Sequence, residues 1–162
     1  MKTLVIFYSR TGTAKKVAEA LAEKLACETE EIFDTQDRSG PMGWLYAGRD
    51  ATLRKLTKIK PPEKNPADYE LAVIGTPIWS FNVSTPIRAY LNEFKNKLPR
   101  VAFYCTMDGS GAERAFREMG QIIGKEPSAT QAFLTKEVAN NTDSHQEKIN
   151  QFAKKLHGQG VE

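Results

Sequence analysis

A hydroxyl-rich turn between a short apolar run and an amphipathic helix is the feature that most constrains this chain. The apolar run covers residues 3–8, and its near-continuous hydrophobicity is typical of a parallel strand covered on both faces. The turn reads Ser9-Arg10-Thr11-Gly12-Thr13-Ala14. Apolar residues then recur at helical spacing over residues 15–25. A strand, a tight turn and a helix in this order favour an α/β fold.

The turn also has the chemistry of an anion site. The first backbone N–H groups of a helix have no partner inside the helix, and the helix dipole adds partial positive charge there. A phosphate can accept several of these hydrogen bonds at once. Ser9, Thr11 and Thr13 can add hydroxyl donors, and Gly12 lets the backbone approach closely. The alternative is a plain turn whose hydroxyls cap the helix, and these residues alone do not separate the two.

The rest of the chain continues the alternation of strands and helices. Further strands are predicted over residues 30–33, 70–75, 100–106 and 129–135. Helices are predicted over residues 44–56, 87–94 and 112–123, and a last one follows a cap at 140–143. This pattern predicts a single domain, 1–162, that is a three-layer α/β/α sandwich. Its five-stranded parallel sheet is expected to have the order 2-1-3-4-5.

Several side chains carry separate expectations. Trp44 and Tyr46 could line a ligand pocket, but we expect them to be buried where the helix over residues 44–56 packs on the sheet. The two cysteines, Cys27 and Cys105, have no metal-ligand spacing and are expected to be reduced, packed thiols. His145 and His157 are expected to be solvated, and no metal site is predicted.

Composition and charge bound the partners. The chain is 40% hydrophobic and 27% charged, as is common in globular proteins. No apolar stretch is long enough to cross a bilayer, and the first is too short for a signal-peptide core, so we expect a cytoplasmic location and no membrane partner. A net charge of +3 is too small to argue for nucleic acid.

Three predicted loops should meet at one edge of the sheet, because the carboxyl ends of parallel strands lie together. They cover residues 9–14, 76–83 and 106–111. The first offers phosphate donors, and the second presents Trp79 and Phe81, which are costly to leave exposed. The third is polar and rich in glycine. Together they suit a flat aromatic ligand with a phosphate tail.

These loops resemble those of the flavodoxin-like family of FMN-binding proteins. The segment Ser9–Ala14 resembles the family's phosphate loop, and Gly75-Thr76-Pro77-Ile78-Trp79-Ser80-Phe81, with Pro86 downstream, resembles the loop flanking the isoalloxazine ring. The resemblance runs from the first strand to the last helix and implies bound FMN and redox chemistry. The implied phosphate contacts are Ser9, Arg10, Thr11, Gly12, Thr13 and Ala14. The implied ring contacts are Thr76, Pro77, Ile78, Trp79, Ser80 and Phe81, with Thr106, Met107, Asp108 and Gly109 on the other side. Arg10 either adds a charge-assisted bond or points into water.

The chain departs from the family's electron carriers in two ways. Those flavodoxins are strongly acidic, whereas this chain is mildly basic, and Met107 stands where a second stacking ring is often found. Three functions stay open: an FMN electron carrier with a redox partner protein, an NAD(P)H-dependent oxidoreductase acting on quinone-like small molecules, and a cofactor-free binding or regulatory module. No catalytic residue is assigned, because the flavin would carry the chemistry. Asp108 and Tyr46 are proton-transfer candidates only by proximity.

Other families that share this sheet order need residues that are absent here. A response regulator would need an acidic cluster after the first strand, where this chain has Tyr8-Ser9-Arg10. A low-molecular-weight phosphatase would need a nucleophilic cysteine in the first loop. Neither the Walker A spacing nor the Gly-x-Gly-x-x-Gly fingerprint follows the first strand.

Overall fold

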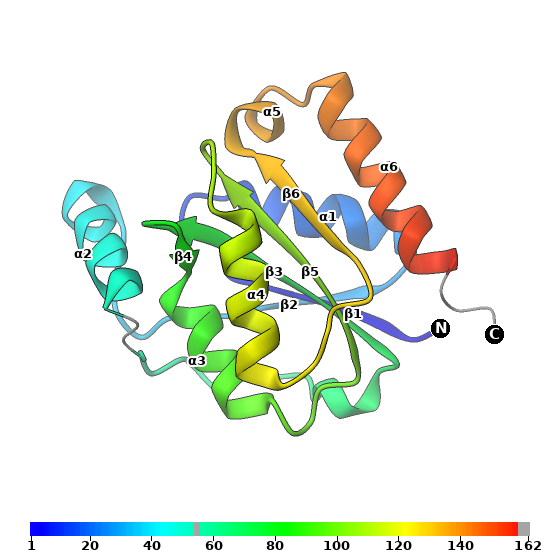
Figure 1. The fold of residues 1–162 in the computed structure, drawn as a ribbon, viewed down its shortest axis with the longest axis horizontal. Helices are drawn as coiled ribbons and strands as arrows, with labels where there is room; N and C mark the ends of the chain where they lie inside the picture. The colour runs from blue at the N-terminus through cyan, green and yellow to red at the C-terminus, as the bar shows by residue number, and fades with distance from the viewer. Residues whose placement is uncertain (54–55, 159–162) are drawn as a thin grey trace.

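A parallel sheet forms the centre of the molecule, as the apolar runs predict. The computed structural model describes residues 1–53 and 56–158 (Figure 1). Its parallel strands are β1 (Thr3–Phe7), β2 (Glu28–Glu31), β3 (Leu71–Trp79), β5 (Arg100–Met107) and β6 (Thr130–Leu134). They are ordered β2-β1-β3-β5-β6, and β4 (Asn82–Val83) pairs antiparallel with β3. Counted along the parallel strands alone, this is the predicted order 2-1-3-4-5, so the predicted fold class is confirmed.

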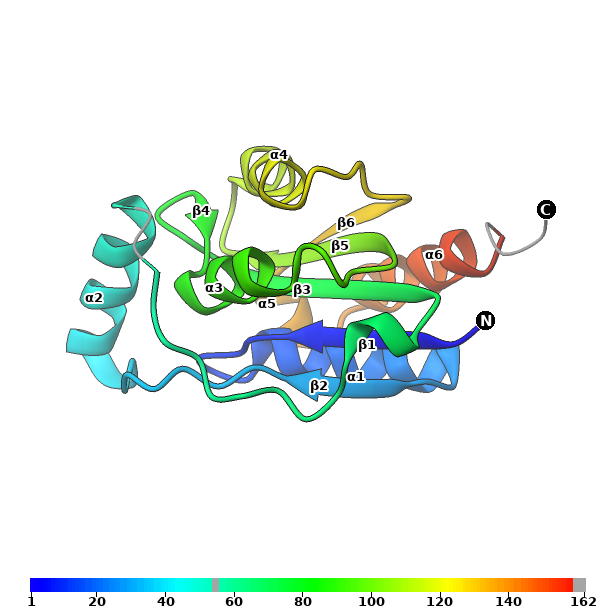
Figure 2. The ribbon, with the colours of Figure 1, turned by 90° about the horizontal axis from the view of Figure 1, so that it is seen from below.

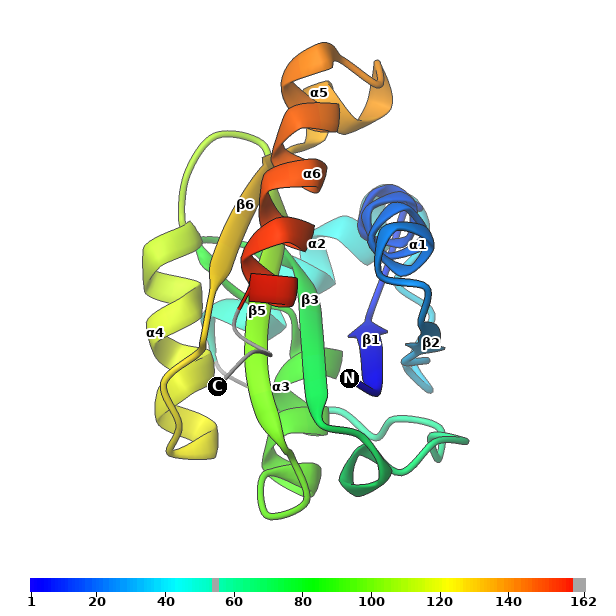
Figure 3. The same ribbon diagram turned by 90° about the vertical axis from the view of Figure 1, so that its right-hand side faces the viewer.

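Helices cover both faces of the sheet. They are α1 (Thr13–Leu25), α2 (Gly40–Thr52), α3 (Thr85–Phe94), α4 (Ala112–Ile123), α5 (Thr135–Ala139) and α6 (Asp143–Gly158), with a short 3-10 turn, η1 (Pro66–Asp68). Leu4 and Ile6 of β1 pack with residues of α3 and α4, whereas Val5 and Phe7 pack with residues of α1 and α6. Figure 3 shows α4 and α1 on opposite sides of the sheet. Successive strand residues thus enter two separate cores.

The strand β3 is longer than the sequence indicates. A loop was expected from Thr76, but the chain stays extended to Trp79, turns at Ser80 and Phe81, and returns as β4. Pairing of Pro77 with β5 and of Ile78 with β4 keeps this segment extended. Ser80 and Phe81 both have positive φ, 48° and 64°, which closes the tight hairpin.

The helix α2 differs most from the prediction. It begins at Gly40 and ends at Thr52 rather than covering residues 44–56, of which 54–55 lie outside the described residues. Its buried face consists of Gly43, Ala47, Asp50 and Ala51. Trp44 is 61% exposed and Tyr46 37% exposed, so the expectation that both are buried is wrong. Figure 2 shows α2 at the end of the sheet to which the strands point. Its small residues let it pack closely there, since an added Cβ at Gly43 would lie 2.1 Å from the Arg38 carbonyl carbon.

The C-terminal part holds a second correction. The short helix α5, which was not predicted, separates β6 from α6. His145, at the start of α6, is buried and lies edge-on to Phe133, with 5.6 Å between ring centroids. The expectation that His145 is solvated is therefore wrong, and its burial lowers its pKa. His157 is exposed, and both cysteines are free thiols. Within residues 1–53 and 56–158, no helix combines the length and hydrophobicity of a membrane span.

Candidate functional site

A groove runs across the end of the sheet at which β1, β3 and β5 finish. Its inner part has a volume of about 190 Å³ and is lined by Ser9, Arg10, Thr11, Thr13, Ala14, Trp44, Pro77, Ile78, Trp79, Thr106, Met107, Asp108 and Thr135. Its outer part, about 520 Å³, is lined by Trp44, Leu45, Gly48, Arg49, Thr52, Leu53, Ile78, Trp79, Ser80 and Asp108. The shared residues make the two parts continuous, and a groove of this size suits a cofactor.

The inner end of the groove lies at the start of α1. The Ser9 hydroxyl oxygen accepts hydrogen bonds from the N–H groups of Gly12, at 3.1 Å, and Lys15, at 3.2 Å. The N–H groups of Thr13 and Ala14 have no protein acceptor within residues 1–53 and 56–158. Gly12 has φ +98°, a conformation that other residues rarely adopt, and it forms the helix N-cap. Amides that gather around one oxygen fit a phosphate group.

Trp79 forms part of the groove wall but is mostly covered. Its side chain is 7% exposed, and Tyr8 meets it edge-on with 5.4 Å between ring centroids. The Arg38 guanidinium lies 5.4 Å from the centre of the Trp79 ring. Burial, with a smaller contribution from the charge of Asp34, raises the pKa of Tyr8 to about 12, so this phenol is neutral at physiological pH. The Trp79 indole is therefore held in place by two side chains, the uncharged phenol of Tyr8 and the guanidinium of Arg38.

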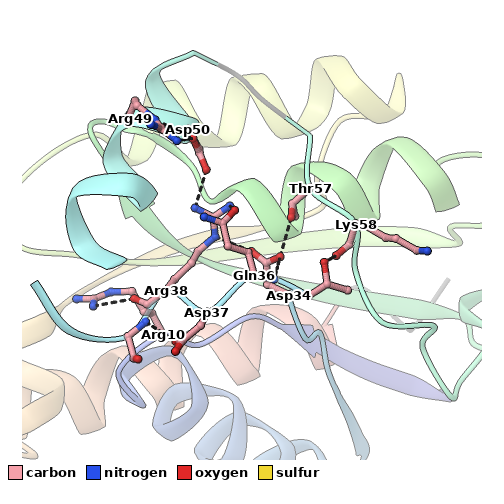
Figure 4. Close-up of polar contacts among 11 residues, drawn as sticks. Arg10, Asp34, Gln36, Asp37, Arg38, Arg49, Asp50, Thr57 and Lys58 are labelled. Atoms are coloured by element: carbon pink, nitrogen blue, oxygen red, sulfur yellow. Dashed lines mark hydrogen bonds and ion pairs between the residues drawn. The ribbon is translucent and has the colours of Figure 1, made fainter. Parts of the chain in front are cut away.

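Arg38, which lies over the Trp79 ring, is also the centre of a buried ionic cluster. Figure 4 shows the members of this cluster. Arg38 donates from Nε to Asp34 at 2.5 Å and from Nη1 to Asp50 at 2.9 Å, and its side chain is 1% exposed. Arg10 donates to the Arg38 carbonyl at 3.4 Å. Burial opposes ionisation at Arg38, but hydrogen bonds to Asp34 and Asp50 outweigh it and raise the pKa of Arg38. Burial likewise opposes ionisation at Asp50, but hydrogen bonds from Arg38 and Arg49 outweigh it and lower the pKa of Asp50. The cluster joins the segment after β2 to α2.

Most of the predicted site residues line this groove, but some do not. Thr76 is fully buried, and its hydroxyl lies 2.9 Å from Ser84 Oγ and accepts the Ser84 N–H at 3.1 Å, which ties β3 to the start of α3. Ser80 lines only the outer part. Gly12, Phe81 and Gly109 do not line either part, and Phe81 projects 58% exposed from the hairpin turn. The cofactor contacts of all these residues stay predictions.

Sequence reasoning ranked one feature of the site wrongly and missed another. Trp44 lines both parts of the groove, which was the alternative named for it, whereas burial was favoured. The Arg38 cluster was not anticipated, because its partners lie on different segments and form no motif. The one available signal was the spacing of Asp34 and Arg38, which lie four residues apart in a stretch without a helical pattern.

Comparisons with known proteins found a matching family model and similar solved structures. A family model described as Flavodoxin matches residues 2–154. The structure is similar to that of a flavoprotein from Lactobacillus acidophilus NCFM in complex with FMN, with a TM-score of 0.71 and 24% identity, covering 86% of this chain and 97% of that one. It is also similar to the two-electron reduced flavodoxin of Megasphaera elsdenii, with a TM-score of 0.60 and 14% identity, covering 94% and 99%. A comparison with curated protein sequences found no significant match.

Proposed function

This chain belongs to the flavodoxin family, and from that premise we propose that it binds FMN non-covalently in the groove and transfers electrons through it. One observation carries the proposal. At the start of α1, amides without an acceptor in the described part of the chain lie at the end of a groove that Trp44 and Trp79 line. Family membership and the FMN bound to the Lactobacillus acidophilus flavoprotein both support FMN as the cofactor.

The residues at the inner end would hold the phosphate. The amides of Thr13 and Ala14, which have no acceptor in the described part of the chain, supply donors together with the hydroxyl of Ser9. Arg10 adds positive charge at the groove wall. Backbone donors suffice, so no lysine is needed. Ile78, Trp79 and Met107 then form an apolar wall that keeps water from a ring placed beside them. FMN, when bound, supplies one- and two-electron redox chemistry.

An NAD(P)H-dependent oxidoreductase is the second candidate function. The outer part of the groove is the observation that favours it, because its apolar residues Leu45 and Leu53 offer a surface for a quinone-like acceptor. Arg49, whose side chain is 52% exposed, could attract an anionic nicotinamide cofactor. The first candidate, an electron carrier, instead needs a redox partner protein.

The absorption spectrum of the purified protein tests the proposal. We expect the two visible bands of bound flavin, either after purification or after addition of FMN and removal of the excess. Colourless protein that retains no FMN would contradict the proposal and favour a cofactor-free module. Anaerobic mixing with NADPH and NADH then separates the two redox functions. Bleaching without a partner reductase indicates an oxidoreductase, and its absence, with bleaching by dithionite, indicates a carrier.

A further inference from the structure

Trp44 has an unusual combination of exposure and position. It is 61% exposed, yet it lines the inner part of the groove together with Ser9, Thr11 and Thr13. It also lines the outer part with Leu45 and Leu53, which are more than half exposed as well. Large apolar side chains that gather beside a groove mark a ligand surface more often than a solvated one.

The two tryptophans of the groove differ in what they can offer to a planar ring. Trp79 is held by Tyr8 at its edge and by Arg38 over its ring. For Trp44, by contrast, no stacking ring and no cation contact occurs within residues 1–53 and 56–158. The open aromatic surface of the groove therefore comes from α2 and not from the hairpin that carries Trp79.

Close packing fixes the backbone that carries Trp44. Its neighbour Gly43 lies so near the Arg38 backbone that an added Cβ would be 2.1 Å from the Arg38 carbonyl carbon. An added Cβ at Gly48 would be 2.8 Å from Ser80 Oγ. Together with the ion pair between Arg38 and Asp50, these contacts press the small-residue face of α2 against the protein. This packing fixes the α2 backbone in the position from which Trp44 and Leu45 reach the groove.

We propose that Trp44, carried by α2, forms the second aromatic wall of the cofactor site and contacts the isoalloxazine ring of FMN. This inference rests on the proposed function. It supplies the ring contact that the third loop lacks, since Met107 stands there in place of an aromatic residue. A protein docked on the same surface is the competing occupant. The position of Trp44 favours the cofactor over a docked protein, because Trp44 lines the inner part of the groove together with the loop suited to phosphate.

Titrations of cofactor-free protein with FMN test the inference. We compare the wild type with Trp44→Ala, Trp44→Phe and a control, Met42→Ala, which removes another exposed apolar side chain of α2 that does not line the groove. Stacking on an aromatic ring is worth about 1 kcal/mol beyond area burial, so Trp44→Ala should weaken FMN binding about 3- to 10-fold. It should also change the visible circular dichroism of the bound flavin. Trp44→Phe should restore most of both, and Met42→Ala should match the wild type.

Several results would overturn the inference without touching the proposed function. One is a Trp44→Ala variant that keeps wild-type affinity and an unchanged flavin dichroism signal, even if it loses binding to a protein partner. Another is equal weakening in Met42→Ala, which would indicate a general effect on α2. If the wild type itself bound no FMN, the proposed function would fail first. Far-ultraviolet circular dichroism checks that every variant is folded.

Discussion

At the scale of single residues, Ser9 lies at the centre of the proposed anion site. Its hydroxyl oxygen accepts from two backbone N–H groups at the start of α1, those of Gly12 and Lys15. An uncharged oxygen thus occupies the point on which the donors converge. If a phosphate accepts the hydrogen bonds of those two amides, the Ser9 hydroxyl can rotate and donate a hydrogen bond to the phosphate. A carboxylate at the same place would instead compete with the phosphate for the amides.

Replacement of Ser9 by aspartate should therefore abolish tight FMN binding while the fold persists. A carboxylate is a good partner for helix N-terminal amides, so we expect thermal stability to be unchanged or slightly higher. The matched control is Ser39→Asp, which adds the same charge at the N-cap of α2. Fluorescence titration with FMN and a thermal melt measure both effects. Retention of wild-type affinity in Ser9→Asp, or equal loss in Ser39→Asp, would count against the assigned phosphate site.

The two thiols should be unreactive in the folded protein. Burial raises the pKa of Cys105 to about 12, and burial and the charge of Glu28 raise that of Cys27 to about 11. At pH 8, about one Cys27 side chain in a thousand is then the reactive thiolate. Modification by a maleimide at pH 8, followed by mass spectrometry, should be slow in native protein and fast in urea. Rapid labelling of native Cys105 would contradict its complete burial.

At the scale of elements, the Arg38 cluster attaches α2 to the body of the protein. Arg38 follows β2, Asp50 lies on α2, and Arg38 also covers the ring of Trp79 at the end of β3. One buried guanidinium therefore contacts both α2 and the end of β3, and Figure 4 shows its ion pairs with Asp34 and Asp50. Loss of one partner would leave a buried charge partly unpaired, which is costly in a nonpolar environment.

Replacement of Asp50 by alanine should lower the free energy of unfolding by about 3 kcal/mol, as is typical when one partner of a buried ion pair is removed. The control is Asp37→Ala, which removes an exposed carboxylate that is next to Arg38 in the chain but forms no bond with it. Urea unfolding followed by tryptophan fluorescence measures both variants. Equal losses in the two would mean that the ion pair does not anchor α2.

At the scale of the whole molecule, the sequence predicts the architecture well where a single pattern decides it. The helix α4 has the predicted bounds, because an amphipathic repeat runs uninterrupted into Gly124. The sheet order follows from the alternation of strands and helices. The hairpin at Trp79 could not be read in this way, because its extended backbone depends on pairing with β4 and β5.

The candidate site was predictable to the extent that it follows from strand topology. Parallel strands bring the three loops together, and the groove lies there with Ser9, Trp79 and Asp108 in its wall. The position of α2 was not predictable, because periodicity shows that a helix has an apolar side but not which side meets the sheet. Here the small residues around Gly43 pack inward and Trp44 remains outside.

The proposed function requires that amides at the start of α1 bind a phosphate whose attached ring lies in the aromatic groove. Calorimetric titration of cofactor-free protein with FMN and with riboflavin, which lacks the phosphate, tests it most directly. Hydrogen bonds to a charged group contribute about 1.5–3 kcal/mol each, so two of them predict that FMN binds one-to-one and at least about 100-fold more tightly than riboflavin. Equal affinities for the two flavins, or no heat with FMN, would contradict the account.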